Sequence, residues 1–192
     1  MPVADSSSPT SPVAGTTGRE AFEGWGEPRS KTVRWHDPLA TATRGATMSG
    51  LEFLRAMQNG EVPPPPIAML FGFGPVSVEQ GDIRFRCTPD ESAYNPIGVV
   101  HGGLVCTLLD TVAACAVHST LPAGVGYTSI EIKVNYLRPV RVDASGPTEL
   151  IAHGWVTKPG RRVAFAEGDV RDEAGRIVAT ASTTCLVFPL AG

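Results

Sequence analysis

The chain has 192 residues, of which 42% are hydrophobic and 18% are charged, and it carries a formal net charge of -3. This composition is typical of an ordinary globular protein, and the length predicts one domain with a real core. The weakly negative charge argues against a broad nucleic-acid-binding surface, although it leaves room for a local basic patch.

The N-terminal segment, residues 1–30, is rich in Ser, Pro, Thr, Gly and Ala. It has neither the charged and apolar regions of a signal peptide nor a membrane anchor, so we expect no membrane association. Such a composition cannot bury enough apolar surface to offset the entropy of ordering, which predicts a disordered tail. The cysteines lack Cys-x-x-Cys or metal-ligand spacing and are interpreted as reduced core residues of a cytoplasmic protein. They are Cys87, Cys106, Cys115 and Cys185.

Residues 31–66 are predicted to form an N-terminal extension with one short helix. Its first part, residues 32–48, shows no clear element, and Asp37-Pro38 predicts a turn there. Ser49 is followed three residues later by Glu52, which is the capping-box pattern of a helix start. An apolar stripe follows on one side of this predicted helix.

The segment Pro63–Pro66 should form an extended polyproline piece that leads into the main domain, residues 67–192. Two strands are predicted next, at residues 71–80 and 81–88. Gly81-Asp82 is the expected hairpin turn between them.

An almost unbroken apolar segment begins at Gly103 and continues to His118. Its length of about four turns fits a helix better than a strand. Its apolar residues leave no polar face, which predicts a helix buried all round. Asp110 is the only fully ionised side chain between His101 and His118, and a lone carboxylate there is costly unless it has a partner. It could bond a neighbouring hydroxyl such as that of Thr107, but buried acids gather at functional sites, which favours a chemical role.

The residues His101-Gly102-Gly103 stand at the start of this predicted helix. Amides at a helix start have no intrahelical partner, so they attract an anion or a polarised carbonyl oxygen, although a Gly pair can also be a simple tight turn. His101 and Asp110 are nine residues apart, which is about 13–14 Å of helix rise and roughly half a turn of net rotation. The two therefore cannot meet around one atom within one chain. If both serve one site, a two-fold dimer must supply the second copy.

Residues 128–137 alternate between apolar and polar side chains, which predicts a half-buried strand with Ser129 on its polar face. Three further strands with strong hairpin turns between them are expected. They are residues 148–157, 161–171 and 176–188. The element order predicts an α+β fold in which an antiparallel sheet of about six strands wraps around one long buried helix.

Three features together resemble one enzyme family. They are Asn95-x-x-Gly98-x-x-His101-Gly102-Gly103, Asp110 within the helix, and the segment from Gly126 to Pro139, GYTSIEIKVNYLRP. They resemble the phenylacetate-degradation type of hotdog-fold acyl-CoA thioesterase, over roughly residues 68–187. The resemblance implies a hotdog fold and hydrolysis of an acyl- or aryl-acyl-CoA thioester to free acid and CoA. It further implies no metal or organic cofactor, and a homodimer or dimer of dimers with sites at the subunit interface.

The resemblance also implies roles for individual residues. Asp110 matches the family's catalytic carboxylate, either as a nucleophile or as a general base. The backbone amide of Gly102 matches the group that polarises the thioester carbonyl, and Gly103 beside it is expected to contact substrate. Asn95 and His101 match residues that order this loop and hold the acyl or water end.

Ser129 falls where a family hydroxyl contacts the water, and Thr128 is the alternative because the strand pattern places it on the apolar face. A bend at the strand's start would reconcile Ser129 with the site. For the CoA phosphates, Lys158, Arg161 and Arg162 offer three cations on one tight turn, and Arg suits phosphate through its fork geometry. Other candidates are Lys133, Arg138 and Arg141.

Two rival functions use the same predicted fold. A non-hydrolytic acyl-CoA-binding protein would need no Asp110. A hotdog hydratase or dehydratase would need an acid and a histidine that converge on one carbon, and the His-Gly-Gly spacing fits the thioesterase pattern better.

Overall fold

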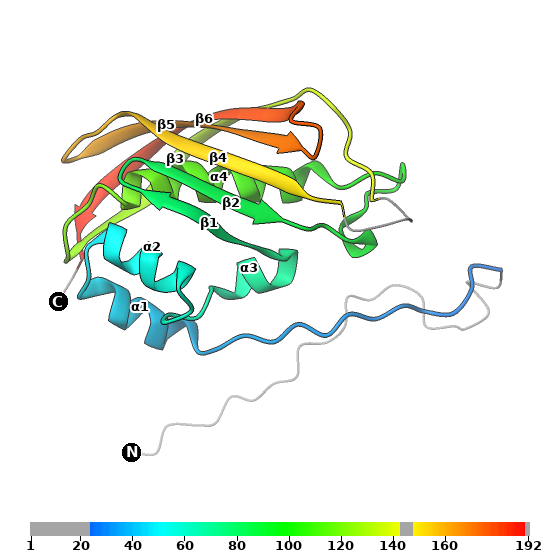
Figure 1. Cartoon of the computed structure of the whole chain (residues 1–192), viewed down its shortest axis with the longest axis horizontal. Helices are drawn as coiled ribbons and strands as arrows, with labels where there is room; N and C mark the ends of the chain where they lie inside the picture. Colours follow the sequence, from blue (N-terminus) through cyan, green and yellow to red (C-terminus); the bar gives the residue numbers. More distant parts are fainter. Residues whose placement is uncertain (1–23, 143–147, 191–192) are drawn as a thin grey trace, which may run out of the picture. The chain divides into compact units, whose positions relative to one another are not determined.

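The computed structural model describes residues 24–142 and 148–190 (Figure 1). The chain divides into two units at residues 32 and 33, and every helix and strand among the described residues belongs to the second. Most of the predicted tail, residues 1–30, lies outside the described residues. Its described part contains no helix or strand.

Six antiparallel strands form one sheet in the order β1-β2-β4-β5-β6-β3 (Figure 1). The long helix α4, Gly102–His118, packs against β2 to β6. This confirms the predicted α+β architecture of an antiparallel sheet around one long helix. The strands are β1 Phe73–Glu79, β2 Asp82–Cys87, β3 Val125–Tyr136, β4 Leu150–Lys158, β5 Val163–Asp172 and β6 Ile177–Pro189.

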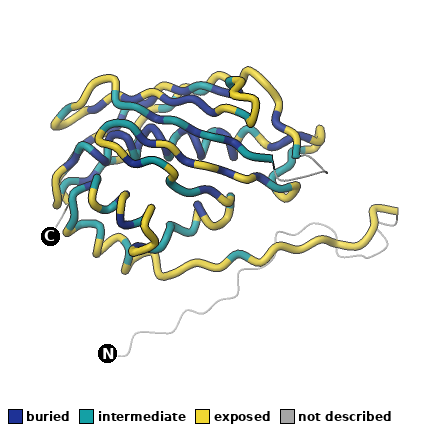
Figure 2. The backbone as a smooth tube through the Cα atoms, viewed as in Figure 1, coloured by how far each residue is buried: buried dark blue, intermediate teal, exposed yellow. Residues whose placement is uncertain are grey.

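Close packing between α4 and the sheet forms most of the core. The buried positions in Figure 2 lie mainly on α4 and on the strands. At its centre, a Cβ on Gly154 of β4 would lie 2.4 Å from the carbonyl oxygen of Val112, so only glycine allows this approach. The prediction that α4 is buried all round is wrong. A partly exposed stripe runs along the side that the sheet leaves uncovered, at positions three and four residues apart. It comprises Thr107, Asp110, Thr111, Cys115 and His118.

Three helices precede the sheet: α1 Pro38–Ala46, α2 Gly50–Gln58 and α3 Pro66–Phe71. The predicted capping box is confirmed, because the Ser49 hydroxyl accepts from the Glu52 N–H and the Glu52 carboxylate accepts from the Ser49 N–H. The expected turn at Asp37-Pro38 is instead the start of α1, with the Asp37 side chain as its N-cap.

The hairpin of β1 and β2 differs from the prediction at its start and its turn. Phe71, expected to open the strand, is the last residue of α3, and Gly72 with φ of 68° ends that helix. The turn residues are Gln80-Gly81, one position earlier than expected, since Glu79 pairs with Asp82. Between this hairpin and α4 lies one short 3-10 helix, η2, Glu91–Ala93.

The two edges of the sheet differ. At β1, side chains of α2 bond the outer carbonyls: Arg55 donates to Val78 and Gln58 to Val76, at 3.3 and 3.0 Å. At β3, no strand pairs with the outer edge within the part of the chain that the structure describes. This open edge carries Ile130 and Tyr136, which are 57% and 55% exposed. An unpaired edge with apolar side chains is a template for pairing with another chain.

Candidate active site

Asp110 lies on the uncovered side of α4 and faces β3. Its Oδ1 accepts a hydrogen bond of 2.7 Å from the hydroxyl of Ser129. The alternative partner considered from the sequence, Thr107, instead donates to the Gly103 carbonyl oxygen at 2.9 Å. The carboxylate is therefore tied to the neighbouring strand and not to its own helix.

A β-bulge explains how Ser129 reaches Asp110. The register between β3 and β6 shifts between Ser129 and Glu131, so Ile130 is an extra residue. Ser129 and Ile132 can then share the face toward α4, although an unbroken strand would place them on opposite faces. Ile130, which an unbroken alternation would place on the apolar face with Thr128, is instead 57% exposed. The bulge is the bend that was suggested near the start of this strand to bring Ser129 to the site.

A cavity of ≈ 480 Å³ opens at Asp110 and Ser129. Thr128 lines it too, but among the described contacts it is Ser129 that bonds the carboxylate. Among the residues that the structure describes, Asp110 is the only carboxylate that lines it. The lining from α4 and β3 comprises Asp110, Thr111, Ala114, Cys115, His118, Tyr127, Thr128 and Ser129.

The far end of this cavity holds titratable groups that the sequence analysis missed. Burial lowers the pKa of the His118 imidazole to about 4, so it is neutral at pH 7. Burial raises the pKa of the Cys115 thiol to about 12, and it also raises that of Tyr127. Cys115 is therefore a protonated thiol and a poor nucleophile. Cys115 and His118 follow Asp110 on α4 by five and eight residues, and with Thr111 between them this spacing could have signalled a shared stripe.

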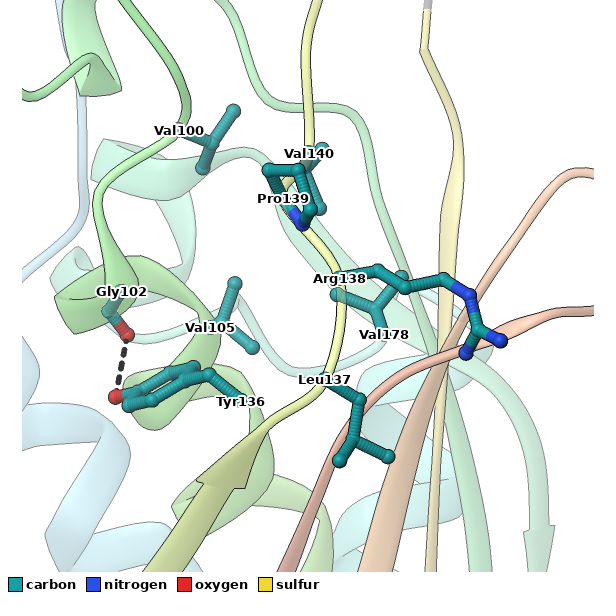
Figure 3. A pocket seen from close by; sticks show the side chains of 9 residues that line it. All are labelled: Val100, Gly102, Val105, Tyr136, Leu137, Arg138, Pro139, Val140 and Val178. Atoms are coloured by element: carbon teal, nitrogen blue, oxygen red, sulfur yellow. Dashed lines mark hydrogen bonds between the residues drawn. The ribbon is translucent and has the colours of Figure 1, made fainter. Parts of the chain in front are cut away.

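The start of α4 is a second polar feature. His101 is the N-cap, and its Nδ1 accepts from the Gly103 N–H at 2.8 Å. Gly102 donates no backbone hydrogen bond among the described residues. Its carbonyl oxygen accepts from the Tyr136 hydroxyl at 3.0 Å (Figure 3). The open donor at this helix start is thus the Gly102 amide and not that of Gly103.

Asn95 orders the loop before the helix. Its Oδ1 accepts from the N–H groups of Ile97 and Val99, at 3.1 and 3.3 Å. Its own N–H donates to the Val99 carbonyl oxygen at 2.9 Å. These bonds close a tight Asn-Pro-Ile-Gly-Val loop that leads to His101.

Gly102 and Asp110 do not meet within one chain. They are eight residues apart on α4, which is about 12 Å of helix rise. Gly102 lines a separate cavity of ≈ 280 Å³ with Val105, Tyr136 and Arg138 among its walls (Figure 3). Within one chain, the Asp110 carboxylate and the Gly102 amide therefore belong to different cavities.

The predicted phosphate-binding cations lie away from Asp110. Lys158, Arg161 and Arg162 are exposed at the turn between β4 and β5, and none of them lines the Asp110 cavity. Arg161 lines a third cavity, of ≈ 910 Å³, and the Lys158 Nζ lies 5.9 Å from the ring centroid of Phe165. Arg138, one of the other candidates for binding the CoA phosphates, lines the cavity at Gly102.

Two absences hold for residues 24–142 and 148–190. No group of three or more His, Cys, Asp or Glu side chains there could hold a metal ion. No helix there is long and apolar enough to cross a membrane.

Comparison with known proteins gives the following similarities. Residues 97–179 match the family model described as the thioesterase superfamily. A Halobacterium salinarum protein named as an esterase is 40% identical over 106 residues, which cover 51% of this chain and 66% of the relative, just under two thirds. A Haemophilus influenzae protein named as an esterase is 30% identical, covering 53% of this chain and 70% of the relative. Human acyl-coenzyme A thioesterase 13 is 28% identical, covering 54% and 71%.

Solved structures share the fold. A phenylacetic acid degradation-related protein of Ralstonia eutropha superposes with a TM-score of 0.62 and 28% identity, covering 69% of this chain and 98% of that one. A Streptococcus mutans protein bound to acetyl CoA superposes with a TM-score of 0.56 and 24% identity, covering 62% and 91%. These similarities confirm the predicted hotdog fold.

Proposed function

The chain belongs to the thioesterase superfamily, and we propose that it hydrolyses an acyl- or aryl-acyl-CoA thioester to a carboxylic acid and free CoA. The observation that carries this proposal is the Asp110 carboxylate, which is bonded to Ser129 at 2.7 Å in the wall of a largely apolar cavity. Support comes from a relative named acyl-coenzyme A thioesterase and from a structure of the same fold bound to acetyl CoA.

Asp110 supplies the attack on the thioester carbon, either directly or by removing a proton from water. In the direct route, a carboxylate oxygen bonds the acyl carbon, the CoA thiolate leaves, and water then cleaves the mixed anhydride. In the second route, hydroxide adds to the carbon and the thiolate leaves from the tetrahedral intermediate. Both routes need one carboxylate oxygen aimed at the substrate. The Ser129 hydroxyl holds the other, Oδ1.

Negative charge grows on the thioester oxygen in both routes, and the Gly102 amide at the start of α4 meets it without reorganisation. Because Gly102 and Asp110 of one chain open into different cavities, the amide comes from a second copy. The open, apolar edge of β3 supports this arrangement, because two such edges can pair with each other in a homodimer. Two such dimers could also associate.

Asn95 and His101 keep the Gly102 amide in place. The Asn95 turn fixes the loop, and the His101 imidazole occupies the Gly103 N–H, so the carbonyl oxygen of the substrate meets one open donor. For the CoA phosphates, Arg161, Arg162 and Lys158 remain the proposed contacts. In the proposed dimer, these three side chains would contact CoA bound at a site that both chains form.

A combined assay separates the proposal from its rivals. The full chain is incubated with phenylacetyl-CoA and octanoyl-CoA in the presence of a thiol reagent, and in parallel with an enoyl-CoA whose absorbance is followed. We expect thiol release in step with free acid and no change in the enoyl absorbance. Binding without thiol release would indicate a non-hydrolytic binder, and loss of enoyl absorbance would indicate a hydratase.

A further inference from the structure

The cavity at Asp110 extends from the partly exposed stripe of α4 to the N-terminal extension. Besides α4 and β3, its walls come from α2, from the segment that follows it and from the β1–β2 hairpin. The α2 side chains in the wall are Phe53, Leu54 and Met57. The family match begins at residue 97, so this wall lies outside the matched segment.

The helix α2 is held firmly over this cavity. The N–H of Gly50 donates to the Leu121 carbonyl oxygen at 3.0 Å, beyond the end of α4. A Cβ on Gly50 would lie 1.8 Å from the His118 carbonyl oxygen, so the two backbones touch and only glycine fits. At its other end, Arg55 and Gln58 bond β1. The position of α2 is thus fixed at both ends.

Aromatic rings close the cavity between α2 and α4. The ring centroids of Phe53 and His118 are 5.8 Å apart, and those of His118 and Tyr127 are 5.0 Å apart. These distances are typical of packed ring pairs. The three rings come from α2, α4 and β3, so they form a continuous part of the cavity wall, and His118 lies eight residues along α4 from Asp110.

We propose that this wall, with Phe53 of α2 as its closing side chain, sets the length of the acyl group that the enzyme accepts. His118 stands eight residues beyond Asp110 on α4, about 12 Å along the helix. An extended alkyl chain zigzags and advances about 1.3 Å per carbon, so this distance takes an acyl chain on the order of eight to ten carbon atoms, or an aryl acyl group. A long-chain fatty acyl group would meet Phe53. The proposal rests on the proposed thioesterase function, and it adds a specificity-determining residue from the N-terminal extension.

The test compares kcat/KM for butanoyl-, octanoyl- and hexadecanoyl-CoA. The wild-type chain should prefer octanoyl-CoA to hexadecanoyl-CoA. Phe53→Ala should raise the hexadecanoyl-to-octanoyl ratio by about tenfold or more, because removing a wall side chain admits further methylenes. The milder Phe53→Leu should move the ratio in the same direction. Ile67→Trp, at a cavity-lining position that is 42% exposed, should shift the preference toward butanoyl-CoA.

Leu39→Ala is the matched control, since Leu39 is 74% exposed on α1 and does not line the cavity. Its length profile should equal that of the wild-type chain. Calorimetric binding of the corresponding non-hydrolysable alkyl-CoA thioethers gives the same profile without turnover. If binding shows the length limit but no thiol is ever released, the thioesterase function fails and the wall stands. If the Phe53 variants keep the wild-type profile in both measurements, the wall does not set acyl length.

Discussion

The Asp110→Asn protein is expected to fold and assemble as the wild-type chain does and to hydrolyse acyl-CoA at least about a hundredfold more slowly. Asn has the same shape as Asp, and its amide oxygen can still accept the hydrogen bond from Ser129. It is neither a nucleophile nor a base, so the chemical step loses its attacking group. The measurement is kcat from thiol release, with circular dichroism and size-exclusion chromatography as checks of structure.

A matched exchange elsewhere in the chain controls for the substitution itself. Asp37 caps α1 and bonds the Leu39 N–H, and Asn is an equally good N-cap. Asp37→Asn should therefore keep full activity. Near-normal hydrolysis by Asp110→Asn would remove Asp110 from the chemistry.

The second large effect is expected from Gly102→Pro, which deletes the open N–H at the start of α4. Gly102 is the first helical residue, where proline is well tolerated. His101 before it has φ of -63° and ψ of 135°, which suits a residue that precedes proline. The helix should therefore start as before while one donor is lost. Loss of one oxyanion donor lowers kcat by about 10²–10³.

Gly102→Ala separates the amide from the added bulk. Both substitutions place a Cβ 3.2 Å from ring atoms of Tyr136, a contact that the side chain can relieve by a small shift. Alanine keeps the N–H, so Gly102→Ala should lose far less turnover than Gly102→Pro. Equal losses in the two variants would assign the effect to crowding against Tyr136 and would contradict the role of the amide.

Much of the fold follows from local patterns. The capping box of Ser49 and Glu52 predicts α2, and the apolar run after His101 predicts α4 to within one residue, since both depend on interactions within a single turn or helix. The hairpins between the last strands follow from their turn residues. Asp110 stands out because it is the one ionised group in an apolar helix.

Other features depend on tertiary contacts. The bulge at Ile130 exists only in the pairing of β3 with β6, so a strict alternation placed Ser129 on the wrong face. The stripe of α4 is partly exposed because no strand covers it, and the apolar residues on the rest of the helix do not show which side the sheet leaves uncovered. The wall formed by Phe53 and His118 joins residues 65 positions apart in the chain, a separation that no local pattern spans.

A site shared between two chains is tested most sharply by complementation between Asp110→Asn and Gly102→Pro. In a heterodimer of these inactive proteins, one interface site collects both defects and the other collects none. Differently tagged variants are mixed, exchanged and purified in series on both tags, which proves that each dimer holds one chain of each kind. These heterodimers should regain activity at about half of their sites, while each parent stays inactive. Verified heterodimers as inactive as their parents would contradict the shared site.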